Sequence, residues 1–129
     1  MKDKKASENT IEYWLEVFGT KKYPKHTKKG GKWLLFIEKE EVDRKWEIIK
    51  EAIRNNLLGE MAKVSTAKTR KENKHVICVY TYSSEDKEDM EKIRGELRNL
   101  GFKEKIPYKR DIETIKGIYG TKEEFYTWN

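Results

Sequence analysis

The chain has 129 residues, which is enough for one domain and too few for a catalytic core with a large accessory module. Charged residues make up 40% of it, against about a quarter in an average soluble protein, and the net charge is +6. Four Trp, seven Tyr and four Phe exclude a disordered chain, because the apolar residues recur in periodic clusters. We expect residues 1–9 to form a flexible tail and residues 10–129 to form a single folded domain.

Several classes of protein are excluded by what the sequence lacks. No apolar run approaches the roughly 18 residues that cross a membrane, and no signal-peptide core follows Met1, so we expect a soluble, cytoplasmic protein without a membrane partner. Cys78, His26 and His75 do not have the spacing of a metal site. Phosphate-loop and dinucleotide-binding motifs are also absent, so we expect no metal and no cofactor. Lys supplies 23 of the 29 basic residues and Gln is absent, a balance typical of proteins from thermophiles.

The first predicted element is a short helix that ends near Gly19. Asn9 and Glu12 have the spacing of a capping box. Apolar residues then recur at helical spacing at Ile11, Trp14, Leu15 and Phe18. We therefore expect Trp14 to lie in the hydrophobic core, as we do for Trp33 and Trp46 further along the chain.

A central strand and an amphipathic helix follow. Residues 32–38 form a compact apolar run, which is typical of a strand buried on both faces. By alternation, one of its faces carries Trp33, Leu35 and Ile37, and the other carries Lys32, Leu34 and Phe36. From about residue 41 to residue 56, apolar side chains repeat every three or four positions, which predicts a helix closed by Gly59. This apolar stripe consists of Val42, Trp46, Ile49, Ile53 and Leu57.

The second half of the chain predicts a strand pair, a helix and two more strands. Residues 61–66 and 75–82 are the strand pair, joined by a basic tip. Ser83 and Ser84 open a helix that is acidic in its first turn and ends at Gly101. Residues 102–111 suit an edge strand because they contain Pro107, and residues 123–128 suit a terminal one. We therefore predict an α+β fold: one mostly antiparallel sheet with two to three amphipathic helices on one face and a ligand on the other.

Lysines on the predicted sheet are the candidate ligand-binding residues. Lys63 lies in mid-strand, where partial desolvation lowers the pKa of an amine. Lys32 begins the first strand, and Lys109 and Arg110 follow Tyr108, so these residues can approach the same surface and hold a phosphate. The alternative is that these cations only extend into solvent. The candidates for stacking on a base are Tyr80, Tyr82, Tyr108, Tyr119 and Trp128.

The excess of positive charge is N-terminal. Residues 1–32 contain nine Lys against four acids, and the segment before Gly30 is basic and turn-prone. We expect its Lys25, Lys28 and Lys29 to form an electrostatic collar for a phosphate-bearing ligand. A solvated loop in a Lys-rich protein is the alternative interpretation.

A series of ordered motifs resembles the family of the basophilic-leukaemia-expressed protein, a domain of unknown function. The motifs are GKWLLF at 31–36, LG at 58–59, AKV at 62–64, HVICVYT at 75–81, YK at 108–109 and GIYG at 117–120. The resemblance covers roughly residues 31–120. It implies the fold of the cap-binding translation initiation factor, a curved antiparallel sheet with helices on its convex side. Fold resemblance alone does not carry cap binding to this chain.

The same segment is similar, more distantly, to phosphothreonine lyase domain proteins. This resemblance implies that Lys63 is a general base, that Lys32 binds phosphate, and that Lys109 or Arg110 clamps it. The lyase histidine would fall two residues after Lys32, where this chain has Leu34. In this alternative, His75 from another strand would replace it as the proton donor.

We therefore predict a small non-enzymatic module that binds RNA, a nucleotide or another phosphorylated ligand on the open sheet face. The predicted ligand-binding residues are Lys32, Lys63, Lys109, Arg110 and Tyr108. One alternative is a phosphothreonine-lyase-like enzyme with Lys63 and His75 as catalytic residues. Another alternative is a protein-interaction domain that docks a partner helix on an apolar patch. No sequence feature indicates an oligomeric state.

Overall fold

The structure is a computed structural model that describes residues 5–24, 29–69, 73–110 and 127–128. In these residues, six strands and two helices follow one another in the order β1-β2-α1-β3-β4-α2-β5-β6. The strands are β1 (Trp14–Phe18), β2 (Gly31–Glu38), β3 (Met61–Ser65), β4 (Lys74–Thr81), β5 (Ile106–Arg110) and β6 (Thr127–Trp128). The helices are α1 (Lys39–Arg54) and α2 (Lys87–Asn99). No helix in these ranges is both long and apolar enough to cross a membrane.

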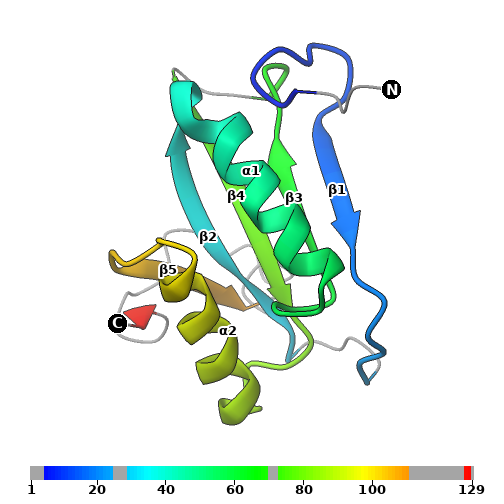
Figure 1. The fold of residues 1–129 in the computed structure, drawn as a ribbon, viewed down its shortest axis with the longest axis vertical. Helices are drawn as coiled ribbons and strands as arrows, with labels where there is room; N and C mark the ends of the chain where they lie inside the picture. Colours follow the sequence, from blue (N-terminus) through cyan, green and yellow to red (C-terminus); the bar gives the residue numbers. More distant parts are fainter. Residues whose placement is uncertain (1–4, 25–28, 70–72, 111–126, 129) are drawn as a thin grey trace.

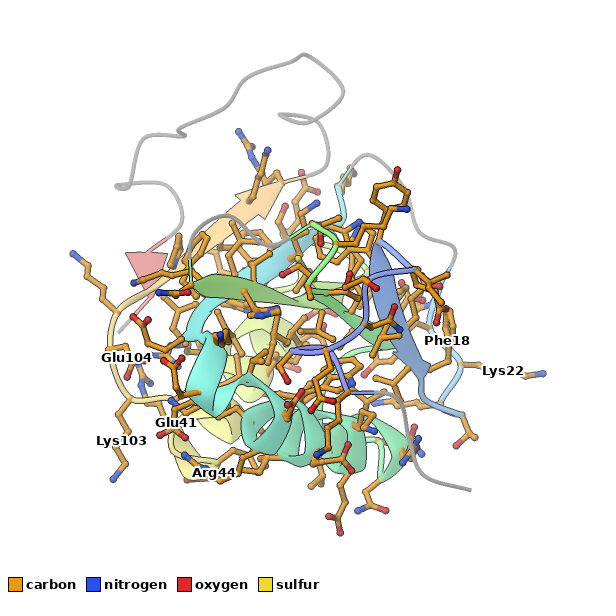
Figure 2. All side chains as sticks on the ribbon, turned by 90° about the horizontal axis from the view of Figure 1, so that it is seen from above. Phe18, Lys22, Glu41, Arg44, Lys103 and Glu104 are labelled. Atoms are coloured by element: carbon orange, nitrogen blue, oxygen red, sulfur yellow. The ribbon has the colours of Figure 1, made fainter. Side chains whose placement is uncertain are left out.

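The strands form one antiparallel sheet in the order β1-β3-β4-β2-β5-β6. Helix α1 packs across β3 and β4, and α2 lies beside the β2–β5 end of the sheet (Figure 1). Figure 2 shows both helices on the same side of the sheet. The predicted α+β architecture, with helices on one face, is confirmed.

The hydrophobic core lies between the sheet and the helices, and β2 shows why. Its side chains alternate as predicted: Trp33, Leu35 and Ile37 are at most 3% exposed, whereas Phe36 is 57% exposed. The predicted apolar stripe of α1 meets this face with Val42, Trp46, Ile49 and Ile53. Burial of these side chains supplies the main favourable free energy of the contact.

Helix α2 begins later than predicted from Ser83 and Ser84. The Asp86 side chain accepts a hydrogen bond from the backbone N–H of Asp89 at 3.1 Å, so Asp86 is the N-cap and Ser83 and Ser84 precede the helix. Met90, Ile93 and Leu97 are buried, as their spacing predicts. Gly101 follows the helix with a φ of 105°, a conformation that glycine adopts without strain.

The predicted first helix is wrong, because residues 14–18 form strand β1, paired with β3. Asn9 and Glu12 do make capping-box contacts: the Asn9 side-chain oxygen accepts the Glu12 N–H at 2.9 Å. These contacts close a turn that leads into the strand. In β1, Val17 is buried toward the helices, while Phe18 is 61% exposed on the opposite face. Apolar residues on both faces of a five-residue strand imitate helical spacing.

Two further predictions about the chain ends differ from the structure. β5 lies between β2 and β6 and is not an edge strand, although β6 covers it with only two residues. Residues 123–126 of the predicted terminal strand lie outside the described residues. Near the N-terminus, Ala6 is fully buried and the backbone N–H of Ser7 donates to Asp43 of α1 at 3.1 Å. Residues 5–9, expected in a flexible tail, therefore pack on the domain.

Candidate functional site

Three lysines share the face of the sheet that no described helix covers, which we call the open face. In the register of β3 and β4, Lys63 lies opposite Cys78, and Cys78 lies opposite Leu34 of β2. Lys32 is two residues from Leu34 and is therefore on the same face, opposite Lys109 of β5. We call Lys32, Lys63 and Lys109 the lysine trio. It extends across the sheet from β3 to β5.

One buried thiol lies on the same face as the trio. Cys78 is opposite Lys63 in the register and only 3% exposed, as the sequence predicts, and burial raises the pKa of its thiol above the ordinary value of 9.0. The positive charges of Lys32, Lys63 and Lys109 act in the opposite direction and favour the thiolate.

Lys63 is partly desolvated. Its ammonium nitrogen lies 4.0 Å from the centre of the Trp14 ring and 5.8 Å from that of Tyr80. Burial lowers the pKa of Lys63 below 10.5, and the charge of Lys32 acts in the same direction, while Cys78 and Glu16 oppose them. The aromatic ring compensates part of the lost hydration through its negative face. Trp14, predicted in the core, is half-buried here on the open face.

Lys32 has an aromatic neighbour of its own. Its ammonium nitrogen lies 5.5 Å from the centre of the Tyr80 ring, so Tyr80 stands between Lys32 and Lys63. The Tyr80 and Trp14 rings thus lie beside the ammonium groups of Lys32 and Lys63 on the open face. Phosphates along the open face would meet ammonium groups from β3, β2 and β5, each held on a paired strand.

Tyr108 does not belong to this site, which corrects the prediction that it binds ligand. It lies opposite Trp33 and is 1% exposed on the helix-covered face. Its hydroxyl lies 2.6 Å from the Thr81 hydroxyl, and its ring packs edge-on against Trp33. Arg110 is two residues further along β5 and has the same alternation as Tyr108. Lys109 is therefore the member of the pair whose register places it with Lys32.

His75 also lies on the wrong face for the role that the lyase resemblance implies. It is three residues from Cys78 in β4, so the two side chains point to opposite faces. The His75 ring is 1% exposed, and its Nδ1 lies 2.7 Å from the backbone oxygen of Ser65. His75 is therefore not positioned to donate a proton beside Lys63.

Of the predicted collar, only Lys29 can be placed. Its ammonium group forms a salt bridge of 3.1 Å with Glu85, and both side chains are exposed. Lys25 and Lys28 lie outside the described residues. No group of acidic, His or Cys side chains that could hold a metal ion occurs among the residues that the structure describes.

The other predicted aromatic candidates have different surroundings. Trp33 and Trp46 are core residues, 0% and 2% exposed, as predicted. The Tyr82 hydroxyl donates a hydrogen bond to Asp86, which raises the pKa of Tyr82 to about 12. Tyr119 lies outside the described residues, and only the backbone of Trp128 is described, in β6.

A groove borders the trio, and sequence reasoning missed it. Its volume is about 690 Å³, and it lies where β1, β3 and β4 meet the segment that follows β1. It is lined by Glu16, Phe18, Gly19, Lys21, Lys22, Tyr23, Glu60, Met61, Lys63 and Tyr80. Figure 2 shows Phe18 and Lys22 projecting on this side of the molecule. Interpreting residues 14–18 as a strand would have revealed Phe18 as an exposed ring on the face of Lys63.

Asn56 holds the segment that closes the groove. It follows α1 with a φ of 59°, and its side-chain oxygen accepts the backbone N–H groups of Thr20 and Lys21 at 3.0 and 2.9 Å. The Tyr23 hydroxyl donates to the backbone oxygen of Leu58 at 3.1 Å. The groove wall is thus tied to the end of α1 by hydrogen bonds from side chains.

Comparison with known protein families assigns this chain to one of them. The family model described as "Basophilic leukemia-expressed protein Bles03" matches residues 24–115. The chain belongs to the Bles03 family. The match includes every member of the lysine trio, while β1 and its groove residues Glu16 and Phe18 lie outside it.

Solved structures of the translation factor eIF4E have a similar fold. One is Ascaris suum eIF4E-3 in complex with the m2,2,7G cap, which is 20% identical with a TM-score of 0.53, covering 64% of this chain and 51% of that one. Another is C. elegans eIF4E-3 in complex with the 4E-binding protein Mextli, which is 14% identical with a TM-score of 0.57, covering 68% and 56%. This chain thus spans about half the length of those proteins. The likeness shows the fold, an open sheet of the eIF4E type.

Proposed function

We propose that this member of the Bles03 family binds the phosphates of a nucleotide or an RNA strand on its open face. The observation that supports this most directly is the placement of Lys32, Lys63 and Lys109 on one face of the sheet, on three different strands. Three ammonium groups held together on one surface repel one another in the free protein. Bound phosphates replace this repulsion with attraction.

The desolvation of Lys63 supports the same proposal. Its lowered pKa reflects an ammonium group whose loss of water outweighs the attraction of Cys78 and Glu16. A phosphate oxygen restores a charged hydrogen-bond partner to that group. The neighbouring Trp14 and Tyr80 rings are suitable partners for a base or ribose beside the phosphate.

The alternatives have less support. A phosphothreonine lyase needs a proton donor beside Lys63, and His75 lies on the other face, bonded to Ser65. A docking site for a partner helix needs a continuous apolar patch. Among the most exposed large apolar side chains, Phe18 and Phe36 lie on different strands of the open face, and Ile11 and Leu57 lie outside the sheet.

Titration with a short single-stranded RNA at several salt concentrations tests the proposal. Three phosphate contacts predict that log K falls with log salt with a slope of about −2, because each contact on a single strand contributes about 0.7. Replacing Lys32, Lys63 or Lys109 by Ala should weaken binding about tenfold and reduce the slope by about 0.7.

Lys103→Ala is the matched control for these variants. Lys103 is exposed and lies on the opposite side of the molecule from Phe18 and Lys22 (Figure 2). The control removes the same charge and should leave the slope unchanged. Equal losses in Lys103→Ala and in the trio variants would mean that only net charge matters, which would contradict a site on the open face.

A further inference from the structure

The groove beside the trio extends the proposed site toward a particular class of ligand. In the pairing of β1 with β3, Phe18 lies opposite Met61. Because Ala62 of β3 lies opposite Val79 of the antiparallel strand β4, Met61 lies opposite Tyr80. Tyr80 lies opposite Lys32, which lies opposite Lys109. One row across the sheet therefore reads Phe18, Met61, Tyr80, Lys32 and Lys109, apolar in one half and cationic in the other.

The apolar half has the properties of a surface that stacks on a base. Phe18 is 61% exposed although it lies in a paired strand, and Met61 and Tyr80 continue the surface into the groove. Two side chains with carboxylates, Glu16 and Glu60, line the same groove, and a carboxylate is a hydrogen-bond acceptor. An aromatic ring with polar edges matches this combination better than a purely apolar side chain does.

The length of the row determines how many phosphates the ligand carries. Strands in a sheet are about 4.8 Å apart, so about 19 Å separates Phe18 from Lys109 across four strand intervals. A nucleotide with its base in the groove brings its own phosphate only to the near end of the trio, at Lys63. Lys32 and Lys109 then require phosphates of the next nucleotides in the strand.

We infer that the ligand is a single-stranded nucleic acid that crosses the sheet from β1 toward β5, with one base against Phe18 in the groove and successive phosphates on Lys63, which lies in the adjacent row, and on Lys32 and Lys109. This inference rests on the proposed phosphate site and adds the base subsite and the direction of the strand. A duplex does not fit, because its bases are paired and stacked on one another and cannot enter the groove.

The affinities for tetrauridylate and for an abasic tetranucleotide with the same phosphates distinguish the base subsite from the phosphate site. The abasic strand should bind about tenfold more weakly, because stacking on one aromatic side chain is lost. Phe18→Ala should weaken tetrauridylate binding by a similar factor and leave abasic binding unchanged. Phe36→Ala is the control, because Phe36 is a comparably exposed ring on the open face that does not line the groove.

Two results would overturn the inference in distinguishable ways. Equal affinities for both strands, unchanged in Phe18→Ala, would remove the base subsite and leave the phosphate site standing. Failure of both strands to bind would remove the phosphate site itself. Because Phe18 is exposed, an unchanged thermal midpoint in Phe18→Ala is expected and shows that any lost affinity does not come from unfolding.

Discussion

Lys63 is partly buried and lies beside an aromatic ring and another positive charge. The residues that act on it are Trp14 and Glu16 on β1, Cys78 on β4 and Lys32 on β2. Burial and Lys32 together favour the neutral amine more than Glu16 and Cys78 favour the charged one, because the pKa is lowered overall. Lys63 therefore loses its proton at a lower pH than a solvated lysine does.

Binding should consequently depend on pH through Lys63. As pH rises toward the ordinary lysine pKa of 10.5, the free protein loses charge at Lys63 before an ordinary lysine would, and phosphate affinity falls. Arginine stays protonated over this range, so Lys63→Arg should keep its affinity. The ratio of the affinities of Lys63→Arg and wild type, measured by titration at each pH, should therefore increase with pH. A constant ratio would show that Lys63 does not contact the phosphate.

The sequence predicted the three lysines of the trio, but the prediction also grouped them with residues that lie on the other face. Alternation in the unambiguous run of β2 placed Lys32 on the face opposite Trp33, as the structure has it. The same period of two separates Lys109 from Tyr108 and Arg110, and the prediction grouped all three. Two consecutive residues of a strand do not share a face, so Tyr108 lies in the core.

At the scale of elements, Gly59 sets how closely the link between α1 and β3 approaches β4. A Cβ at Gly59 would lie 1.9 Å from the backbone oxygen of Tyr80. That contact involves main chain, which cannot move aside as the end of a long side chain can. The link between α1 and β3 is therefore tied to the strand that carries Tyr80 and Cys78 across the open face.

Gly59→Ala should lower the free energy of unfolding by about 3 kcal/mol, the upper range for overpacking, because β4 must shift. Gly95→Ala in α2 is the matched control, since a Cβ there meets nothing within 4 Å. It should raise stability by about 0.5–1 kcal/mol through helix propensity. Urea unfolding curves measure both. Equal stability of Gly59→Ala and wild type would show that the approach to Tyr80 is looser than the structure has it.

The long elements were predictable and the short first strand was not. Helix α1 has four turns of apolar periodicity, which a strand cannot reproduce over that length. β1 has five residues, and the pairing with β3 that makes it a strand involves residues about 50 positions away in the chain. Local sequence spacing does not contain that long-range contact, so the groove next to β1 was missed with it.

At the scale of the whole molecule, the strand order determines which lysines share one face of the sheet. β3, β4, β2 and β5 are neighbours in the sheet, although α1 separates β2 from β3 in the chain. This order places lysines from three distant segments in one cluster and puts the aromatic groove at its β1 end. The sequence showed that the chain has excess lysine, while the sheet determines where three of these lysines meet.

The central claim is that the lysine trio and the adjoining row form the binding surface. A titration of the isotopically labelled chain with tetrauridylate, followed by the backbone amide shifts in NMR spectra, tests it most directly. We predict the largest shifts at Lys32, Lys63, Lys109 and Phe18, with the exposed face of α1 around Arg44 unchanged. The largest shifts on α1 or α2, with the open face unchanged, would contradict the account.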